Sequence, residues 1–111
     1  IMRIVYGDTA VMLSGDASDE IENNLVKLYG KQLKSDVLKL GHHGSKTSTS
    51  EAWLGAVSPR FAVVSAAIDN RYGHPHQDVM QRVFARDIET SHTGTDGTIT
   101  FVSDGETVWR E

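Results

Sequence analysis

Residues 36–45 read Asp-Val-Leu-Lys-Leu-Gly-His-His-Gly-Ser, a short apolar strand pattern that runs directly into two adjacent histidines between glycines. A second cluster, Tyr-Gly-His-Pro-His, occupies residues 72–76, and a Gly-Asp pair occupies residues 15–16. Imidazole and carboxylate are the ligands that borderline divalent metals prefer. Glycine beside a ligand lets the backbone turn tightly behind it. These clusters predict part of a metal-dependent hydrolytic site.

Composition limits the class of protein. The 111 residues, 39% hydrophobic and 23% charged, are typical of one small globular domain or a piece of a larger one. The net charge of -4 argues against binding nucleic acid through bulk positive potential, although a local patch or a bound metal can still attract phosphate. No stretch approaches the ~20 apolar residues that span a bilayer, and the first residues do not resemble a signal peptide. The chain has no cysteine, so metal ligands must be His, Asp or Glu.

Apolar periodicity predicts one α/β unit over residues 1–111. Strands are expected over 1–6, 9–14, 36–40, 61–67, 88–91, 98–102 and 107–109, with turns at 7–8, 96–97 and 104–105. Helices are expected over 18–30, 51–57 and 77–86. The apolar stripe of the first helix is Ile21, Leu25 and Leu28, and that of the third is Val79, Val83 and Phe84.

The three polar clusters each follow the carboxyl end of a predicted strand. In open α/β sheets this edge is where ligand sites assemble from different strands. Asp16 is a candidate metal ligand that could bridge two ions, with a cap of the following helix, by Asp16 or Ser18, as the alternative. Adjacent side chains at a strand end point in different directions. We therefore expect one of His42 and His43 to bind a metal and the other to face the substrate.

Four motifs in order along the chain carry a family resemblance. They read Leu-Ser-Gly-Asp-Ala (13–17), Asp-Val-Leu-Lys-Leu-Gly-His-His-Gly-Ser (36–45), Asn-Arg-Tyr-Gly-His-Pro-His (70–76) and Asp-Gly-Thr-Ile (96–99). Together they resemble the C-terminal half of the metallo-β-lactamase-like domain of ComEC-type DNA-uptake competence proteins. The resemblance covers essentially the whole chain.

The resemblance implies a fold and a set of site residues. The fold is α/β, half of a metallo-β-lactamase-like αββα sandwich, with a mixed sheet and flanking helices. The complete domain would hold two ions, zinc or manganese, with Asp16 and His43 among the metal ligands. His42 would face the substrate phosphate, and His74 would donate a proton to a leaving oxygen or hold a phosphate. The reaction implied is metal-assisted hydrolysis of a phosphodiester, with DNA as the family's substrate.

Other residues are assigned from their positions. Lys46 and Arg71 are candidates for a small phosphate-contacting patch, with solvated surface as the alternative, and Ser45 and Tyr72 are further expected substrate contacts. His76 is expected to begin a helix, and His92 is expected to be a surface residue in a loop over 89–94. Trp53 and Trp109 are expected to be packing residues.

One family element is missing from the sequence. The family's N-terminal half supplies a His-x-His-x-Asp-His cluster, and no such pattern occurs in these residues. We therefore expect a fragment of a longer protein, with a degenerate remnant or a partner chain that supplies the other half as alternatives. The isolated chain is expected to bind metal weakly at most and to lack appreciable hydrolase activity.

Three functional hypotheses follow. The first is part of a metal-dependent nuclease domain of a competence protein, at the extracytoplasmic face of a bacterial membrane as part of a larger membrane protein. The second is a free-standing, secreted or cytoplasmic esterase or phosphodiesterase of the same superfamily that acts on a small substrate. The third is a non-catalytic half-domain that serves assembly. The expected partners are DNA or another phosphodiester, the missing N-terminal half, and a second copy through the exposed sheet edge.

Overall fold

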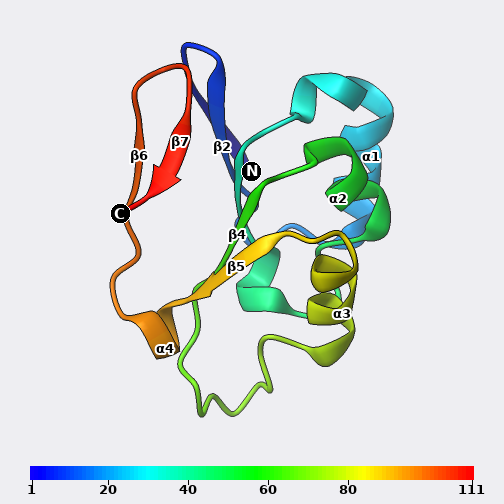
Figure 1. Ribbon diagram of the computed structural model, residues 1–111. Helices are drawn as coiled ribbons and strands as arrows, with labels where there is room; N and C mark the ends of the chain where they lie inside the picture. Colours follow the sequence, from blue (N-terminus) through cyan, green and yellow to red (C-terminus); the bar gives the residue numbers. More distant parts are fainter.

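A five-stranded sheet in the order β1-β2-β3-β4-β5 forms the middle layer of the structure, a computed structural model that describes residues 1–111 (Figure 1). Its strands are β1 (Met2–Tyr6), β2 (Thr9–Leu13), β3 (Val37–Lys39), β4 (Phe61–Val64) and β5 (Glu89–His92). The first two strands pair antiparallel across the predicted turn at residues 7–8, and the others pair parallel. The prediction of a mixed sheet is therefore confirmed.

Helices cover one face of this sheet and a hairpin lies against the other (Figure 1). The helices are α1 (Asp19–Tyr29), α2 (Glu51–Val57) and α3 (Gln77–Ala85), and the hairpin strands are β6 (Phe101–Ser103) and β7 (Val108–Arg110). Three short helical turns complete the chain: η1 (Gly30–Leu33), η2 (Gly41–Gly44) and α4 (Thr93–Asp96). The layers are thus hairpin, sheet and helices. None of the helices combines the length and the apolar character that crossing a membrane requires.

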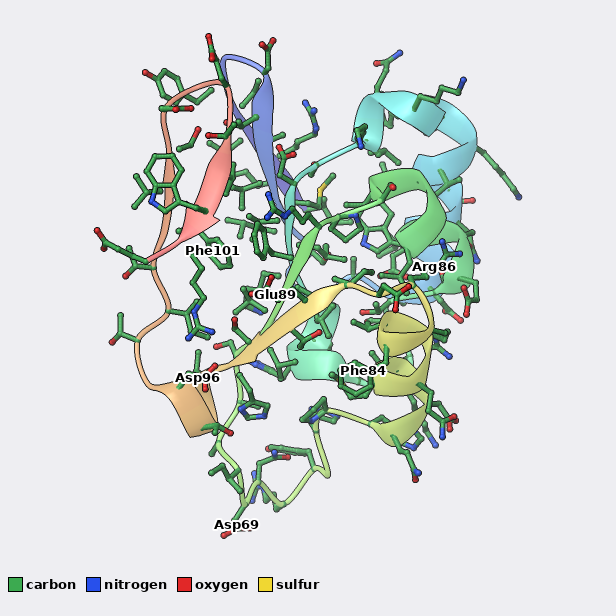
Figure 2. All side chains as sticks on the ribbon, viewed as in Figure 1. Asp69, Phe84, Arg86, Glu89, Asp96 and Phe101 are labelled. Atoms are coloured by element: carbon green, nitrogen blue, oxygen red, sulfur yellow. The ribbon has the colours of Figure 1, made fainter.

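Two apolar clusters hold the layers together. The larger lies between the sheet and the helices and includes the fully buried Met12, Leu38 and Trp53. The smaller lies beneath the hairpin, where Phe61 of β4 meets Phe101 of β6 with ring centroids 5.1 Å apart. Phe101 is labelled on the hairpin in Figure 2. Burial of each large apolar side chain contributes about 1.5–3 kcal/mol. The prediction that Trp53 is a packing residue is confirmed.

Several expected core residues lie at the surface instead. In α1, Ile21 is 49% exposed and Leu28 is 72% exposed, whereas Glu22 is fully buried. Phe84 in α3 is 60% exposed, because the side of that helix that faces the core carries Val79, Val83 and the partly buried Met80. Trp109 is 43% exposed, since its neighbour Val108 occupies the sheet-facing side of β7. The predicted apolar stripes were therefore wrong at Ile21 and Leu28 of α1 and at Phe84 of α3.

The predicted strand boundaries also need correction. β4 ends at Val64 rather than at residue 67, and β6 begins at Phe101 rather than at residue 98. The expected turn at residues 96–97 is the end of α4, with Gly97 as its C-cap. His92 is the last residue of β5 and is partly buried, so the prediction of a surface loop over 89–94 was wrong.

Candidate functional site

The two adjacent histidines lie in the turn η2, directly after β3. Their backbone φ angles are 46° for His42 and 57° for His43, so both lie in the left-handed region. Nδ1 of His43 lies 2.6 Å from the carbonyl oxygen of Ser65, which follows β4. Because a carbonyl oxygen only accepts hydrogen bonds, Nδ1 carries the proton and Nε2 keeps its lone pair. A backbone carbonyl on one ring nitrogen is a common way to orient a metal-binding histidine.

Asp16 is held close to this turn through the backbone. The amide of His42 donates a hydrogen bond of 2.8 Å to the carbonyl oxygen of Gly15, which joins the loop after β2 to the loop after β3. The carboxylate of Asp16 is exposed and has no hydrogen-bond partner within the chain. Ser18, not Asp16, occupies the N-cap of α1, and no side chain makes a capping bond there. A free carboxylate beside the histidine turn fits the ligand interpretation better than the capping one.

The loop after β4 adds a third imidazole to the site. The ring centroids of His42 and His74 are 5.5 Å apart, and those of His42 and His43 are 6.3 Å apart. Tyr72 stacks on His74 with 5.8 Å between centroids and an interplanar angle of 26°. Burial lowers the pKa of His74, and the neighbouring imidazoles of His42, His43 and His76 lower it further. The neutral form of His74 is therefore favoured.

Gly44 joins the two histidine motifs. The amide of His76 donates to the carbonyl oxygen of Gly44 at 2.8 Å. A Cβ added at Gly44 would lie only 2.6 Å from Cβ of Pro75, and the φ angle of +84° also favours glycine. His76 is the N-cap of α3 and its ring accepts a hydrogen bond from the amide of Asp78, which confirms the prediction that His76 begins a helix.

Asn70 fixes the loop that carries His74, a role that sequence reasoning missed. Its side-chain oxygen accepts a hydrogen bond of 2.9 Å from the amide of His74. Its side-chain nitrogen donates to the carbonyl oxygen of His74 and, at 2.9 Å, to that of Ala67. The available signal was only that Asn favours loops in which its side chain bonds to nearby backbone.

A loop behind the site connects several elements. The hydroxyl of Ser48 donates to the carbonyl oxygen of Ala17 at 2.6 Å. The carboxylate of Glu22 accepts hydrogen bonds of 2.7 Å and 2.9 Å from the amides of Thr49 and Ser50, at the start of α2. Burial raises the pKa of Glu22, although these hydrogen bonds act in the opposite direction. Glu22 faces inward to make these bonds, which explains why Ile21 does not.

The predicted substrate contacts separate in the structure. Arg71 donates to the hydroxyl of Tyr72 at 2.7 Å, and its guanidinium lies 4.9 Å from the centre of the tyrosine ring. Tyr72 is next to His74, and Arg71 contacts Tyr72. Ser45 is buried and its hydroxyl bonds to Thr47 at 3.0 Å, while Lys46 is exposed and makes no hydrogen bond.

A cavity of about 500 Å³ opens beside His43 and His74. It lies between the loops that follow β4 and β5, and Asp69 marks the tip of the first of these loops (Figure 2). Its lining consists of His43, Ser65, Ala66, Ala67, Asn70, Tyr72, His74, Thr93 and Gly94. Of these residues, sequence reasoning had singled out only the two histidines and Tyr72.

The donor atoms fit a metal site only in part. His43 and Asp16 offer an oriented imidazole and a free carboxylate, which is the right chemistry for zinc or manganese. However, no group of three or more His, Asp or Glu side chains in this chain is arranged to hold a metal ion. Zinc sites in proteins use three or four protein ligands. Asp16 and His43 alone would therefore be too few ligands for such a site.

The chain is similar to a small part of several longer bacterial proteins, among them one named as a competence protein. The chain is 44% identical to Competence protein ComA of Neisseria gonorrhoeae over 101 residues, 91% of the chain. It is 40% identical to ComE operon protein 3 of Bacillus subtilis over 91% of the chain, and 39% identical to Recombination protein 2 of Haemophilus influenzae over 89%. It spans only 15%, 13% and 12% of the lengths of these relatives. No family model matches the chain.

Proposed function

We propose that this chain is part of a metal-dependent phosphodiester hydrolase domain of a competence protein, with a metallo-β-lactamase-like fold. One observation carries the proposal: the turns after β2, β3 and β4 bring Asp16 and three imidazoles to one edge of the sheet. Among these, His43 has its Nδ1 on the Ser65 carbonyl and its Nε2 available as a ligand. The names of the relatives support the competence context.

Asp16 and His43 would hold a zinc or manganese ion in this proposal. When bound, such an ion polarises a phosphoryl oxygen and lowers the pKa of a water molecule on it towards ~7. His42 and His74 would contact the phosphodiester. The neutral form of His74 is favoured in the free chain, and the negative charge of a bound phosphodiester would raise its pKa. Substrate binding would thus protonate His74 and enable it to give a proton to the leaving oxygen.

The rest of the ligand set would come from outside this chain. Every residue of β1 is exposed, including the apolar Met2, Ile4 and Val5, and β1 is an edge strand. We propose that the remainder of the domain covers this strand and supplies the missing ligands, and that a second copy pairs there when the remainder is absent. The proposed location is the extracytoplasmic face of a bacterial membrane.

The test uses the complete domain, that is, this chain joined to the part of its parent protein that precedes it. Asp16→Asn and His43→Asn remove a ligand atom, and Asn tolerates the left-handed backbone at residue 43. Each variant is expected to lose at least about tenfold in metal affinity, since even residues that only orient metal ligands cost 10–100-fold. Metal content by mass spectrometry and hydrolysis of bis(p-nitrophenyl) phosphate and of DNA are measured together.

Asp87→Asn is the matched control, because Asp87 is exposed, has a φ of 54° and lies outside the site. This control should keep full metal content and activity. Unchanged metal content in both site variants would exclude the ligand assignment, and a metal-loaded wild-type domain without phosphodiesterase activity would exclude the reaction.

A further inference from the structure

One peptide unit lies between His43 and the short helix α4. It consists of the carbonyl group of Ser65, whose oxygen lies 2.6 Å from Nδ1 of His43, and the amide of Ala66. This unit is planar and trans, so its C=O and N–H point in opposite directions. On the side away from His43, the hydroxyl oxygen of Thr93 accepts a hydrogen bond of 3.1 Å from the Ala66 amide. His43 and Thr93 therefore contact opposite ends of the same unit.

The Thr93 hydroxyl bonds to both polar groups of the Ala66 backbone, since it also donates to the Ala66 carbonyl oxygen at 3.3 Å. The ladder between β4 and β5 ends at the pair Val64 and His92. The Thr93 side chain thus continues the connection between the two strands at the point where the chain leaves β5 for α4. A Cβ added at Gly94 would lie 2.8 Å from the Ala66 carbonyl oxygen, so α4 and the loop after β4 are in direct contact.

The turn that carries Thr93 is held by a hydrogen-bond network of its own. Asp96, labelled on α4 in Figure 2, accepts hydrogen bonds from the amide of His92 at 3.2 Å and from the guanidinium of Arg110 at 3.3 Å. Arg110 lies in β7 and also donates to the hydroxyl of Ser91 at 2.8 Å. These bonds connect α4 to β5 and to the hairpin. The Thr93 hydroxyl therefore has a fixed position relative to the sheet.

The His43 ring needs an acceptor whose orientation does not change. His43 is exposed, so water competes for both of its ring nitrogens. Which nitrogen of a neutral imidazole carries the proton is decided by the hydrogen bonds that the two nitrogens make. If the Ser65 carbonyl turned away, the proton would also occupy Nε2, and a protonated Nε2 has no lone pair to offer a metal. A carbonyl that keeps its orientation holds the proton on Nδ1.

We infer that Thr93 is a positioning residue for His43: its hydroxyl fixes the peptide unit between Ser65 and Ala66, and this unit keeps the His43 proton on Nδ1 and the lone pair on Nε2. A hydrogen bond accepted from the Ala66 amide also polarises the Ser65 carbonyl and makes it a stronger acceptor. The inference rests on the proposed function for the use of Nε2 as a metal ligand. The effect on the His43 ring itself needs no metal.

The experiment determines the His43 tautomer in the metal-free 111-residue chain by NMR of the ring nitrogens, at about pH 8.5, where imidazole is ordinarily neutral. The wild type is expected to have the proton on Nδ1. Thr93→Val replaces the hydroxyl by a methyl group. The population ratio of the Nε2–H to the Nδ1–H tautomer should then rise about two- to tenfold, the range that corresponds to loss of one ordinary hydrogen bond.

Thr93→Ser keeps the hydroxyl and should leave the His43 tautomer as in the wild type. Thr95→Val is the matched control, because Thr95 is an exposed residue of the same turn without a side-chain hydrogen bond. Urea unfolding of each variant separates positioning from general stability. A Thr93→Val chain that is less stable but keeps the wild-type tautomer would make Thr93 merely structural and would overturn the inference. An equal tautomer shift in Thr95→Val would do the same.

Gly94→Ala is a second, independent variant. Its Cβ would have to displace the Ala66 backbone, and with it the Ser65 carbonyl, so the tautomer ratio of His43 should shift in the same direction as in Thr93→Val. An unchanged ratio in Gly94→Ala would contradict the coupling between α4 and His43.

The inference and the proposed function fail in different ways. A complete domain that binds no metal would contradict the proposed function, while the effect of Thr93→Val on the His43 tautomer in the metal-free chain would remain. A complete domain that binds metal and hydrolyses phosphodiesters, with a His43 tautomer that does not respond to Thr93→Val, would contradict the inference alone.

Discussion

His74 is the residue whose chemistry depends most on its surroundings. It is partly buried and lies beside Tyr72 and His42, and the imidazoles of His43 and His76 are also close enough to affect its charge. Burial is the largest cause of its lowered pKa, and repulsion from His42, His43 and His76 adds to it. Folding therefore favours the neutral form of His74.

The sign of the resulting pH dependence follows from linkage. In the unfolded chain His74 binds a proton near pH ~6.5, whereas the folded chain binds it only at lower pH. The free energy of unfolding should therefore have its full His74 contribution above pH ~6.5. That contribution should be lost as the pH falls through the lowered pKa of the folded state.

NMR titration of the His74 ring in the chain with a chelator present measures this pKa directly. His42→Asn removes one repelling imidazole and should raise the pKa of His74, but not to its usual value, because burial remains. His92→Asn is the control and should leave the His74 pKa unchanged, since His92 is not among the groups that shift it. A His74 ring that titrates at or above ~6.5 in the folded chain would contradict the expectation.

Asn70 determines the loop conformation at the same scale. Asn70→Ala removes a side chain that bonds to both the amide and the carbonyl oxygen of His74 and to the carbonyl oxygen of Ala67. We expect a loss of about 1–3 kcal/mol in the free energy of unfolding and faster exchange of the His74 amide hydrogen. Urea unfolding and hydrogen exchange measure the two effects.

Asn24→Ala is the control for this change, because Asn24 is an exposed residue of α1 without a side-chain hydrogen bond. Alanine is the better helix former, so this variant should be slightly more stable, by less than about 0.7 kcal/mol. Equal effects of the two substitutions would show that the Asn70 contacts do not hold the loop.

At the scale of the elements, Glu22 connects α1 to the start of α2. Its carboxylate accepts hydrogen bonds from the amides of Thr49 and Ser50. These amides would otherwise be unsatisfied at the beginning of α2. Glu22→Ala is expected to lower the free energy of unfolding by about 1–3 kcal/mol, because two amides lose their acceptor. Glu20→Ala, at an exposed position of the same helix, should change it by no more than about 0.5 kcal/mol.

Thermal and urea unfolding of both variants check this expectation. A Glu22→Ala variant as stable as the wild type would contradict this expectation. It would mean that the cost of burying the carboxylate equals the stabilisation from its two hydrogen bonds. In that case Glu22 would not be the residue that orients α1.

Local pattern predicted the elements well and their orientation less well. The strands before Asp16 and before His42 were predictable because short apolar runs end there in Gly-rich turns, and so was the edge of the sheet on which these residues lie. The rotation of α1 about its axis, which turns Glu22 inward, was not predictable. A buried glutamate that accepts hydrogen bonds from two backbone amides depends on tertiary contacts, which periodicity does not encode. Leu28 is exposed for a related reason. Its spacing identifies it as part of an apolar face, but the sequence does not show whether another element covers that face.

The candidate site divides in a similar way. His42, His43 and His74 stood out because several imidazoles fall in Gly-containing turns that follow predicted strands. Ser65 and Asn70 did not, because the first acts through its backbone carbonyl and the second bonds only to backbone atoms. Such contacts depend on how loops from separate strands meet, and that information is not present in either loop alone.

At the scale of the whole molecule, the exposed edge strand β1 is the least protected part of the sheet. Its side chains are apolar except for Arg3, and Met2, Val5 and Tyr6 are 59%, 55% and 62% exposed. Long apolar edge strands tend to pair with other chains. We expect the isolated chain to associate as its concentration rises, and Ile4→Lys to shift it towards the monomer.

Sedimentation velocity over a range of concentrations measures this association. Ile68→Lys is the matched control, because Ile68 is 66% exposed but lies in the loop after β4, away from the edge strand. It should leave association unchanged. A wild-type chain that stays monomeric at all concentrations, or an equal effect of the two lysine variants, would contradict pairing through β1.

The left-handed backbone of His42 and His43 also bears on how such a domain can change over evolutionary time. Besides glycine, asparagine and aspartate tolerate this conformation best, and each of their codons differs from a histidine codon only in its first base. A lineage released from selection could therefore lose either imidazole in one mutational step while the turn, and with it the outline of the sheet edge, persists. In distant homologues, the residue types at positions 42 and 43 would therefore indicate retained chemistry better than similarity of the overall fold does.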